Sequence, residues 1–316
     1  MNLIYFSKTQ IAATQANTIV IMKEYIYRIN KWLIRFRSKN TRIDRDLYLV
    51  IENKGMLCEL INEREARKVT RLTITGPLDG CDMDYIHNSF RRLRELDLSD
   101  CIISAGEFRC SVHKDIHQIK ACRVVPHMFH IEKLISITLP FSTTDLCLNN
   151  MWDPGAFINS LEKINISEKN RFYSSLNGIL YDKERKALLK APPAVKNVII
   201  PLGVRLISKG SFKDCKTLRS VSIPETVTYI GDYAFENCIS LKVLRIPQSL
   251  VHAGLYPFGK NIMFSDIYCF AEIPPVVTDS PVFTGECRLH VPYGTLFIYF
   301  TSPFWKQFKY IDETAR

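Results

Sequence analysis

The sequence predicts an elongated solenoid in which short parallel β-strands stack with a period of about 23 residues, joined by irregular or short helical return segments. A phrase within residues 211–250 occurs twice at a constant offset of 23 residues. Each copy contains alternating apolar residues and ends at a proline. A fixed period of about 20 to 50 residues is typical of stacked units, because one unit alone cannot bury its apolar face. We therefore expect one elongated body with capped ends.

Equivalent residues fill both copies of the phrase. The pairs are Ile207 and Ile230, Phe212 and Phe235, Cys215 and Cys238, Leu218 and Leu241, Val221 and Leu244, Ile223 and Ile246, and Pro224 and Pro247. A partial copy precedes them around Val198 and Pro201, and Phe258 continues the series downstream. Looser strand cores extend upstream to Leu72 and Ile74, so the predicted stack covers most of the chain.

One repeat unit explains how a coil is built. Val221 and Ile223 point inward while Ser222 points outward, which predicts one short strand in each coil. Pro224 ends this strand because proline has no amide hydrogen for a neighbouring strand. Gly231 follows in the turn, where we expect it to adopt a backbone angle that other residues avoid.

Outward strand positions are the predicted binding surface, because the inward residues form the core. These positions hold no carboxylate pair, basic stripe or aromatic stack, so they name no ligand class. In chain order they are Thr73, Asp97, Thr138, Asn165, Ile199, Ser222 and Arg245.

Composition limits the possible classes of protein. With 316 residues and 47% hydrophobic residues, the chain can build a continuous core. The chain contains no run of about 20 apolar residues, so no membrane-spanning helix is predicted. The ten cysteines follow no disulfide framework, and we expect Cys215 and Cys238 to be core residues. The net charge of +10 is concentrated in residues 23–45, where eight Lys or Arg residues face only two acidic ones.

The repeat unit resembles the BspA-like leucine-rich repeat, whose pattern is I-G-x-x-A-F-x-x-C-x-x-L-x-x-V-x-I-P. The matching positions are Ile230, Gly231, Ala234, Phe235, Cys238, Leu241, Ile246 and Pro247. The C-terminal segment is similar to the closing module of many members from gut and oral anaerobic bacteria. That similarity rests on Val291, Pro292, Gly294, Tyr299, Trp305, Phe308 and Ile311.

This resemblance implies a surface or secreted protein that binds or adheres to a protein or glycan partner, without enzymatic activity and without a cofactor. It supplies no catalytic residues to transfer to this chain. Nucleic acid is not an expected partner, because no matching fold signature accompanies the basic charge. The first 22 residues contain no clear export signal, so a cytoplasmic location is the alternative.

Three regions follow from these patterns: a basic amphipathic segment at 1–45, the solenoid at 46–290 with an irregular insertion near 101–124, and an aromatic cap at 291–316. Residues 22–37 have helical spacing of apolar residues. They could cap the first coil, lie on an anionic membrane surface, or form a poorly ordered leader. The C-terminal aromatics predict a cap, with a platform for stacking on sugars as the alternative. Exposure of Trp305 separates the two.

The insertion contains the weak metal-site candidates Cys110, His113, His117 and Cys122. Thiolate and imidazole suit zinc, and the two histidines would share one face of a helix. The spacing matches no common zinc finger, so an irregular insertion without metal is favoured, and metal-binding or hydrolytic activity there is the alternative function. Asp82 and Asp84 are expected in a solvated turn. A phosphate-loop spacing from Gly254 to Lys260 lacks the Ser or Thr that would hold magnesium.

Overall fold

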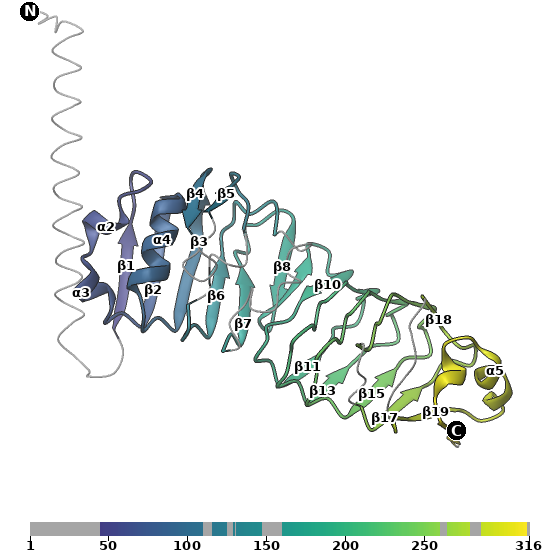
Figure 1. Ribbon diagram of the computed structural model, residues 1–316. Coiled ribbons are helices and arrows are strands. Elements are labelled where there is room, and N and C mark those ends of the chain that lie inside the picture. Colours follow the sequence, from purple (N-terminus) through teal and green to yellow (C-terminus); the bar gives the residue numbers. More distant parts are fainter. Residues whose placement is uncertain are drawn as a thin grey trace, which may run out of the picture.

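The computed structural model describes residues 45–109, 116–124, 129, 131–146, 160–259, 264–278 and 286–314. They form an elongated body whose strands lie across its long axis, and helix α5 (Leu296–Thr301) lies at the far end (Figure 1). Residues 22–37 lie outside the described part, so the role of the basic N-terminal segment stays a prediction. In the described part, no helix is long and apolar enough to cross a bilayer. The predicted solenoid of parallel strands is confirmed.

The first sheet is entirely parallel and has the strand order β1-β2-β3-β6-β7. Its strands are β1 (Asp46–Val50), β2 (Arg71–Leu78), β3 (Glu95–Ile103), β6 (Ser136–Leu139) and β7 (Lys163–Ile166). Their alternating residues are buried, as expected for strands that cover a core on one face.

The region expected to be an irregular insertion contains regular structure. Strand β3 runs on to Ile103, and β4 (Gly106–Arg109) pairs antiparallel with β5 (Ile116–Ile119). The metal-site alternative assumed a helical face for His117, whereas this residue lies in β5 opposite Phe108. A hairpin satisfies its own backbone hydrogen bonds, so it can extend between two coils without breaking the stack.

Short helices form the return side of the first coils: α2 (Leu57–Leu60), α3 (Glu63–Ala66) and α4 (Gly80–Ser89). The prediction of a solvated turn at Asp82 is wrong. Asp82 is buried in the first turn of α4, where its carboxylate accepts hydrogen bonds from the backbone N–H groups of Gly55 (2.7 Å) and Leu57 (2.9 Å). Asp79 caps the helix in a reciprocal capping box with Asp82. The carboxylate thus joins α4 to the preceding coil.

The chain direction reverses in the middle of the body. Strands β8 (Tyr173–Leu176), β9 (Ile179–Asp182) and β10 (Ala187–Lys190) form two antiparallel pairs, which the repeat did not predict. Strand β9 separates two hydrophobic cores, because Leu180 packs into the N-terminal core while Ile179 and Tyr181 pack into the C-terminal one.

The regular coils follow β10, and most contribute two strands where the sequence predicted one. The longer strands are β11 (Asn197–Ile199), β13 (Ser220–Ser222), β15 (Val243–Ile246), β17 (Asp266–Cys269), β19 (Arg288–Pro292) and β20 (Tyr310–Thr314). The shorter ones, on the second face, are β12 (Leu206–Ile207), β14 (Tyr229–Ile230), β16 (His252–Ala253) and β18 (Val276–Val277). Ile207 pairs with Ile230, as the offset of 23 residues requires.

Left-handed backbone positions recur in the turns, although not at the predicted glycine. Gly231 has no positive φ. Its role is close approach, since a Cβ there would lie 2.4 Å from the backbone nitrogen of Lys209. Positive φ angles occur instead at Gly210, Tyr233 and Tyr256, which are spaced by the repeat offset. The turn is therefore set by coil packing rather than by glycine alone.

The C-terminal end packs as a cap. Trp305 lies in the 3-10 helix η3 (Trp305–Gln307), is 1% exposed, and donates its indole N–H to the carbonyl of Pro275 at 2.8 Å. Trp305 is therefore not available for stacking on a sugar. The predicted boundary at 290/291 falls inside β19, and β20 adds one further parallel strand to the same sheet.

Candidate functional site

The predicted outward positions fall into two groups. Thr73, Asp97, Thr138 and Asn165 are direct neighbours across β2, β3, β6 and β7. In the second half of the body Ile199 pairs with Ser222, and Arg245 pairs with Tyr268. Cross-strand register therefore forms rows of side chains on the outer face of each sheet. Their binding role stays a prediction.

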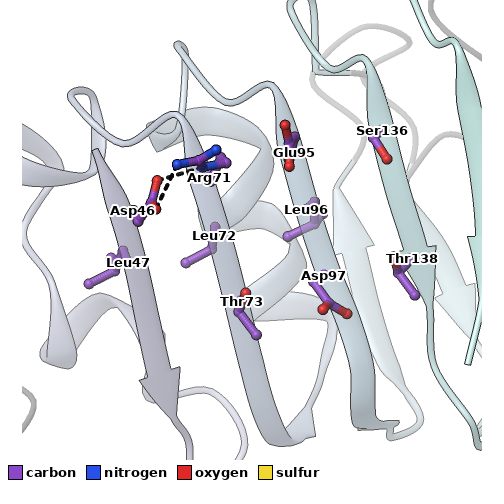
Figure 2. A pocket seen from close by; sticks show the side chains of 10 residues that line it. All are labelled: Asp46, Leu47, Arg71, Leu72, Thr73, Glu95, Leu96, Asp97, Ser136 and Thr138. Atoms are coloured by element: carbon purple, nitrogen blue, oxygen red, sulfur yellow. Dashed lines mark hydrogen bonds and ion pairs between the residues drawn. The ribbon is translucent and has the colours of Figure 1, made fainter. Parts of the chain in front are cut away.

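A polar groove opens on the outer face of the first sheet, with a cavity volume of about 240 Å³. Figure 2 shows the side chains that line the groove, which come from four adjacent strands, β1, β2, β3 and β6. Its polar lining consists of Asp46, Arg71, Thr73, Glu95, Asp97, Ser136 and Thr138, and the buried Leu47, Leu72 and Leu96 complete it. Three of the predicted positions thus lie in one cavity, while Asn165 is not part of its lining.

The sequence prediction missed four of the polar lining residues. Asp46, Arg71, Glu95 and Ser136 form a second row, because they pair with one another across the sheet. Arg71, Glu95 and Ser136 each lie two residues before a predicted outward residue. Alternation along a strand places residues i and i+2 on the same face, so extending each strand by two residues would have found them.

The charges of the groove are partly paired. The Arg71 guanidinium forms two hydrogen bonds with the Asp46 carboxylate, at 2.6 Å and 2.8 Å. Asp97 accepts a hydrogen bond from the backbone N–H of Ser99 at 2.9 Å, and Glu95 is exposed. Three carboxylates and one guanidinium make the groove locally acidic on a chain of net charge +10. The hydroxyls of Thr73, Ser136 and Thr138 flank the carboxylates of Glu95 and Asp97.

The metal-site candidates are not brought together in the described part. Cys110 and His113 lie outside the described residues, and for His117 only the backbone in β5 is described. Cys122 is half-buried and has a positive φ of 59°. Among the described side chains, no group of three His, Cys, Asp or Glu residues could hold a metal ion.

Buried ionisable groups outside the groove serve the core. Burial raises the pKa of the Cys101 and Cys215 thiols to about 12, so neither is a ready nucleophile near neutral pH. Burial lowers the pKa of Lys190, whose ammonium donates to the carbonyls of Gly210 (3.0 Å) and Lys213 (3.3 Å). These contacts join neighbouring coils.

Residues 188–279 match the family model described as the BspA type leucine rich repeat region, in six copies. This part of the chain carries BspA-type leucine-rich repeats. These BspA-type repeats extend from β10, the last strand of the chain reversal, through the regular coils to β18. The groove lies on the coils that precede the matched BspA-type region.

Several solved structures are similar at low identity. A leucine-rich repeat protein from Eubacterium ventriosum has a TM-score of 0.44 and 14% identity, covering 85% of this chain and 80% of that chain. For a leucine rich cell surface protein from Faecalibacterium prausnitzii the values are 0.35 and 13%, with 89% and 82% covered. The pneumococcal vaccine antigen PcpA has a TM-score of 0.34 and 13% identity, with 78% and 79% covered. No curated protein sequence matches the chain.

Proposed function

We propose that this protein is a non-enzymatic binding protein and that its partner docks in the groove on the first sheet. The single observation that carries the proposal is the convergence of seven polar side chains from four adjacent strands in one cavity. The strands fix these side chains in register, so little conformational entropy is lost when a partner docks.

The groove favours a partner that presents hydrogen-bond donors or positive charge. Glu95 and Asp97 can accept hydrogen bonds on the same strand face, and hydroxyls on both sides can donate or accept. The lining includes no cysteine or histidine, so it offers no Ser–His or Cys–His pair for covalent catalysis. A protein segment or a glycan meets these requirements. Adhesion at the cell surface extends the proposal and rests on the resemblance of the repeat.

Filling the groove tests its role. Binding of the full chain to an array of defined peptides and unsulfated glycans is compared for wild type, Thr138→Trp and Ser222→Trp. Thr138 lines the groove, whereas Ser222 is an exposed outward residue on β13 away from it. We expect Thr138→Trp to weaken the strongest array signals by about tenfold or more, because an indole occupies the cavity. The Ser222→Trp control keeps them.

The opposite pattern contradicts the groove as the docking site. If Ser222→Trp removes the signals and Thr138→Trp leaves them unchanged, the partner docks on the regular coils instead. Surface biotinylation of intact native cells tests the proposed location separately, and labelling no greater than that of a cytoplasmic marker contradicts it.

A further inference from the structure

A second charged surface lies on the regular coils, where β11, β13 and β15 begin. The residue directly before each of these strands is basic and exposed: Lys196, Arg219 and Lys242. They recur at the repeat offset of 23 residues, so the BspA-type period itself generates the row. We call these three residues the basic column.

Hydrogen bonds between coils hold the column in register. The backbone N–H of Arg219 donates to the carbonyl of Lys196 at 2.7 Å. On the preceding turns, the Thr217 hydroxyl donates to the carbonyl of Val195 at 3.0 Å, and the Ser240 hydroxyl donates to that of Lys216 at 2.6 Å. Neighbouring strands lie about 4.8 Å apart, so the column presents one cation per coil at this spacing.

The outward residues of the same strands add no negative charge to the column. They are Asn197, Ile199, Ser220, Ser222, Val243 and Arg245, and none is acidic. Within the described residues, neither Lys196 nor Arg219 forms an ion pair. On the next strand, the carboxylate of Asp266 is bound to the His290 ring at 2.9 Å.

Arg245 adds a fourth cation to this face. Its guanidinium carbon lies 4.6 Å from the centroid of the Tyr268 ring, and the other face of that ring stacks on His290 at 4.2 Å. Stacking holds the face of the guanidinium and leaves its N–H groups available to an anionic ligand. Arg245 is therefore positioned in advance beside the basic column.

We propose that the basic column and Arg245 bind a linear sulfated polysaccharide. Like charges repeated at one-coil spacing repel one another, and a polymer with regularly spaced anionic groups relieves this repulsion along its length. Asn197, Ser220 and Ser222 supply amide and hydroxyl groups that can hydrogen-bond sugar hydroxyls. Single-stranded nucleic acid is less suited, because β11 and β13 present no aromatic side chains on which bases could stack.

The proposal is independent of the groove. The groove is acidic and repels a polyanion, whereas the basic column lies on coils after the chain reversal. Thr138→Trp is therefore expected to leave polysaccharide binding unchanged.

The test uses the full chain and a heparin-derived octasaccharide as the sulfated probe. The triple variant Lys196→Gln, Arg219→Gln, Lys242→Gln is compared with a control of equal charge change, Lys54→Gln, Arg91→Gln, Arg92→Gln. The control residues are exposed and lie on the N-terminal coils. We expect wild-type affinity for the octasaccharide to fall as salt rises from about 50 to about 200 mM. The column variant should lose about tenfold or more in affinity. The control variant should change in affinity by about twofold or less. Thermal melting checks that both variants are folded.

Three results would overturn the proposal. The first is no octasaccharide binding by wild type at low salt. The second is an equal loss in the two triple variants, which would show that total charge rather than the column binds the probe. The third is tighter binding of a single-stranded oligonucleotide that the column variant also loses, which would assign the surface to nucleic acid.

Discussion

Stacked aromatic side chains join the regular coils to one another. The rings of Phe212 and Phe235 lie 5.1 Å apart and are nearly parallel, at 5°. Both residues are fully buried and occupy the same position in successive repeats. One side chain per coil thus fills the interior and contacts its own copy in the next coil.

Phe235→Ala is expected to lower the free energy of unfolding by about 3 to 5 kcal/mol, because it opens a cavity between two coils. Denaturant unfolding measures the loss. The matched control is Ile199→Ala, whose side chain is 78% exposed and which should change stability by about 0.5 kcal/mol or less. A loss below about 1 kcal/mol for Phe235→Ala would mean that this position is not tightly packed.

Buried residues such as Phe212 and Phe235 could be predicted from the sequence, because each inward position recurs together with its neighbouring positions in the next repeat. The burial of Trp305 did not follow from the sequence, because an aromatic segment fits either a buried cap or an exposed platform. Asp82 and Gly231 were misjudged for a common reason. Their roles depend on backbone groups about 22 to 27 residues away, and no local pattern records such contacts.

At the scale of elements, the connection between β7 and β8 is fixed by one buried amide. The Asn170 side chain donates to the carbonyls of Thr143 (2.7 Å) and Phe141 (3.1 Å). Its oxygen accepts from the backbone N–H groups of Phe172 and Tyr173, both at 2.8 Å. The amide therefore joins the turn after β6 to the start of β8, where the chain reversal begins.

Asn170→Ala is expected to destabilise the protein by about 3 kcal/mol, because several buried backbone groups lose their partners at once. Hydrogen exchange of the β8 amides should also become faster. Asn53→Ala, at an exposed position, serves as the control and should leave both measurements unchanged. Unaltered exchange in β8 would show that the pairing of β8 with β9 alone fixes the reversal.

Elements that follow the repeat were predicted well, and those that interrupt it were not. The coils from β11 to β15 keep the offset of 23 residues, so their strands could be placed from alternation alone. The hairpin of β4 and β5 and the antiparallel strands β8 to β10 have no counterpart in other units. The groove was found only in part, because Thr73, Asp97 and Thr138 were selected as single outward residues rather than as rows.

At the scale of the whole molecule, one strand divides two cores. Leu180 packs into the N-terminal core, and its neighbours Ile179 and Tyr181 pack into the C-terminal core. Solenoid units interact mainly with their neighbours, so a shared strand limits how far local unfolding spreads. The two halves are expected to open as separate cooperative units.

Native-state hydrogen exchange tests this expectation with a reciprocal pair of variants. Phe90→Ala removes a fully buried ring from the N-terminal core and should lower the opening free energy of β1 to β7 by about 3 to 5 kcal/mol, with little change in β11 to β19. Phe235→Ala should show the reverse pattern. Equal loss of protection in both halves for either variant would show a single cooperative unit.

Because the regular unit has a constant length, each added repeat lengthens the molecule by the same distance. Insertion of one 23-residue unit between β10 and β11 would move the basic column by about 4.8 Å relative to the acidic groove, with neither surface altered. A partner that engages both places would then sense the change as a change in effective concentration, without any altered contact. Variation in repeat number could therefore change the distance between the two surfaces in steps of one coil, so that it matches bivalent partners of different length.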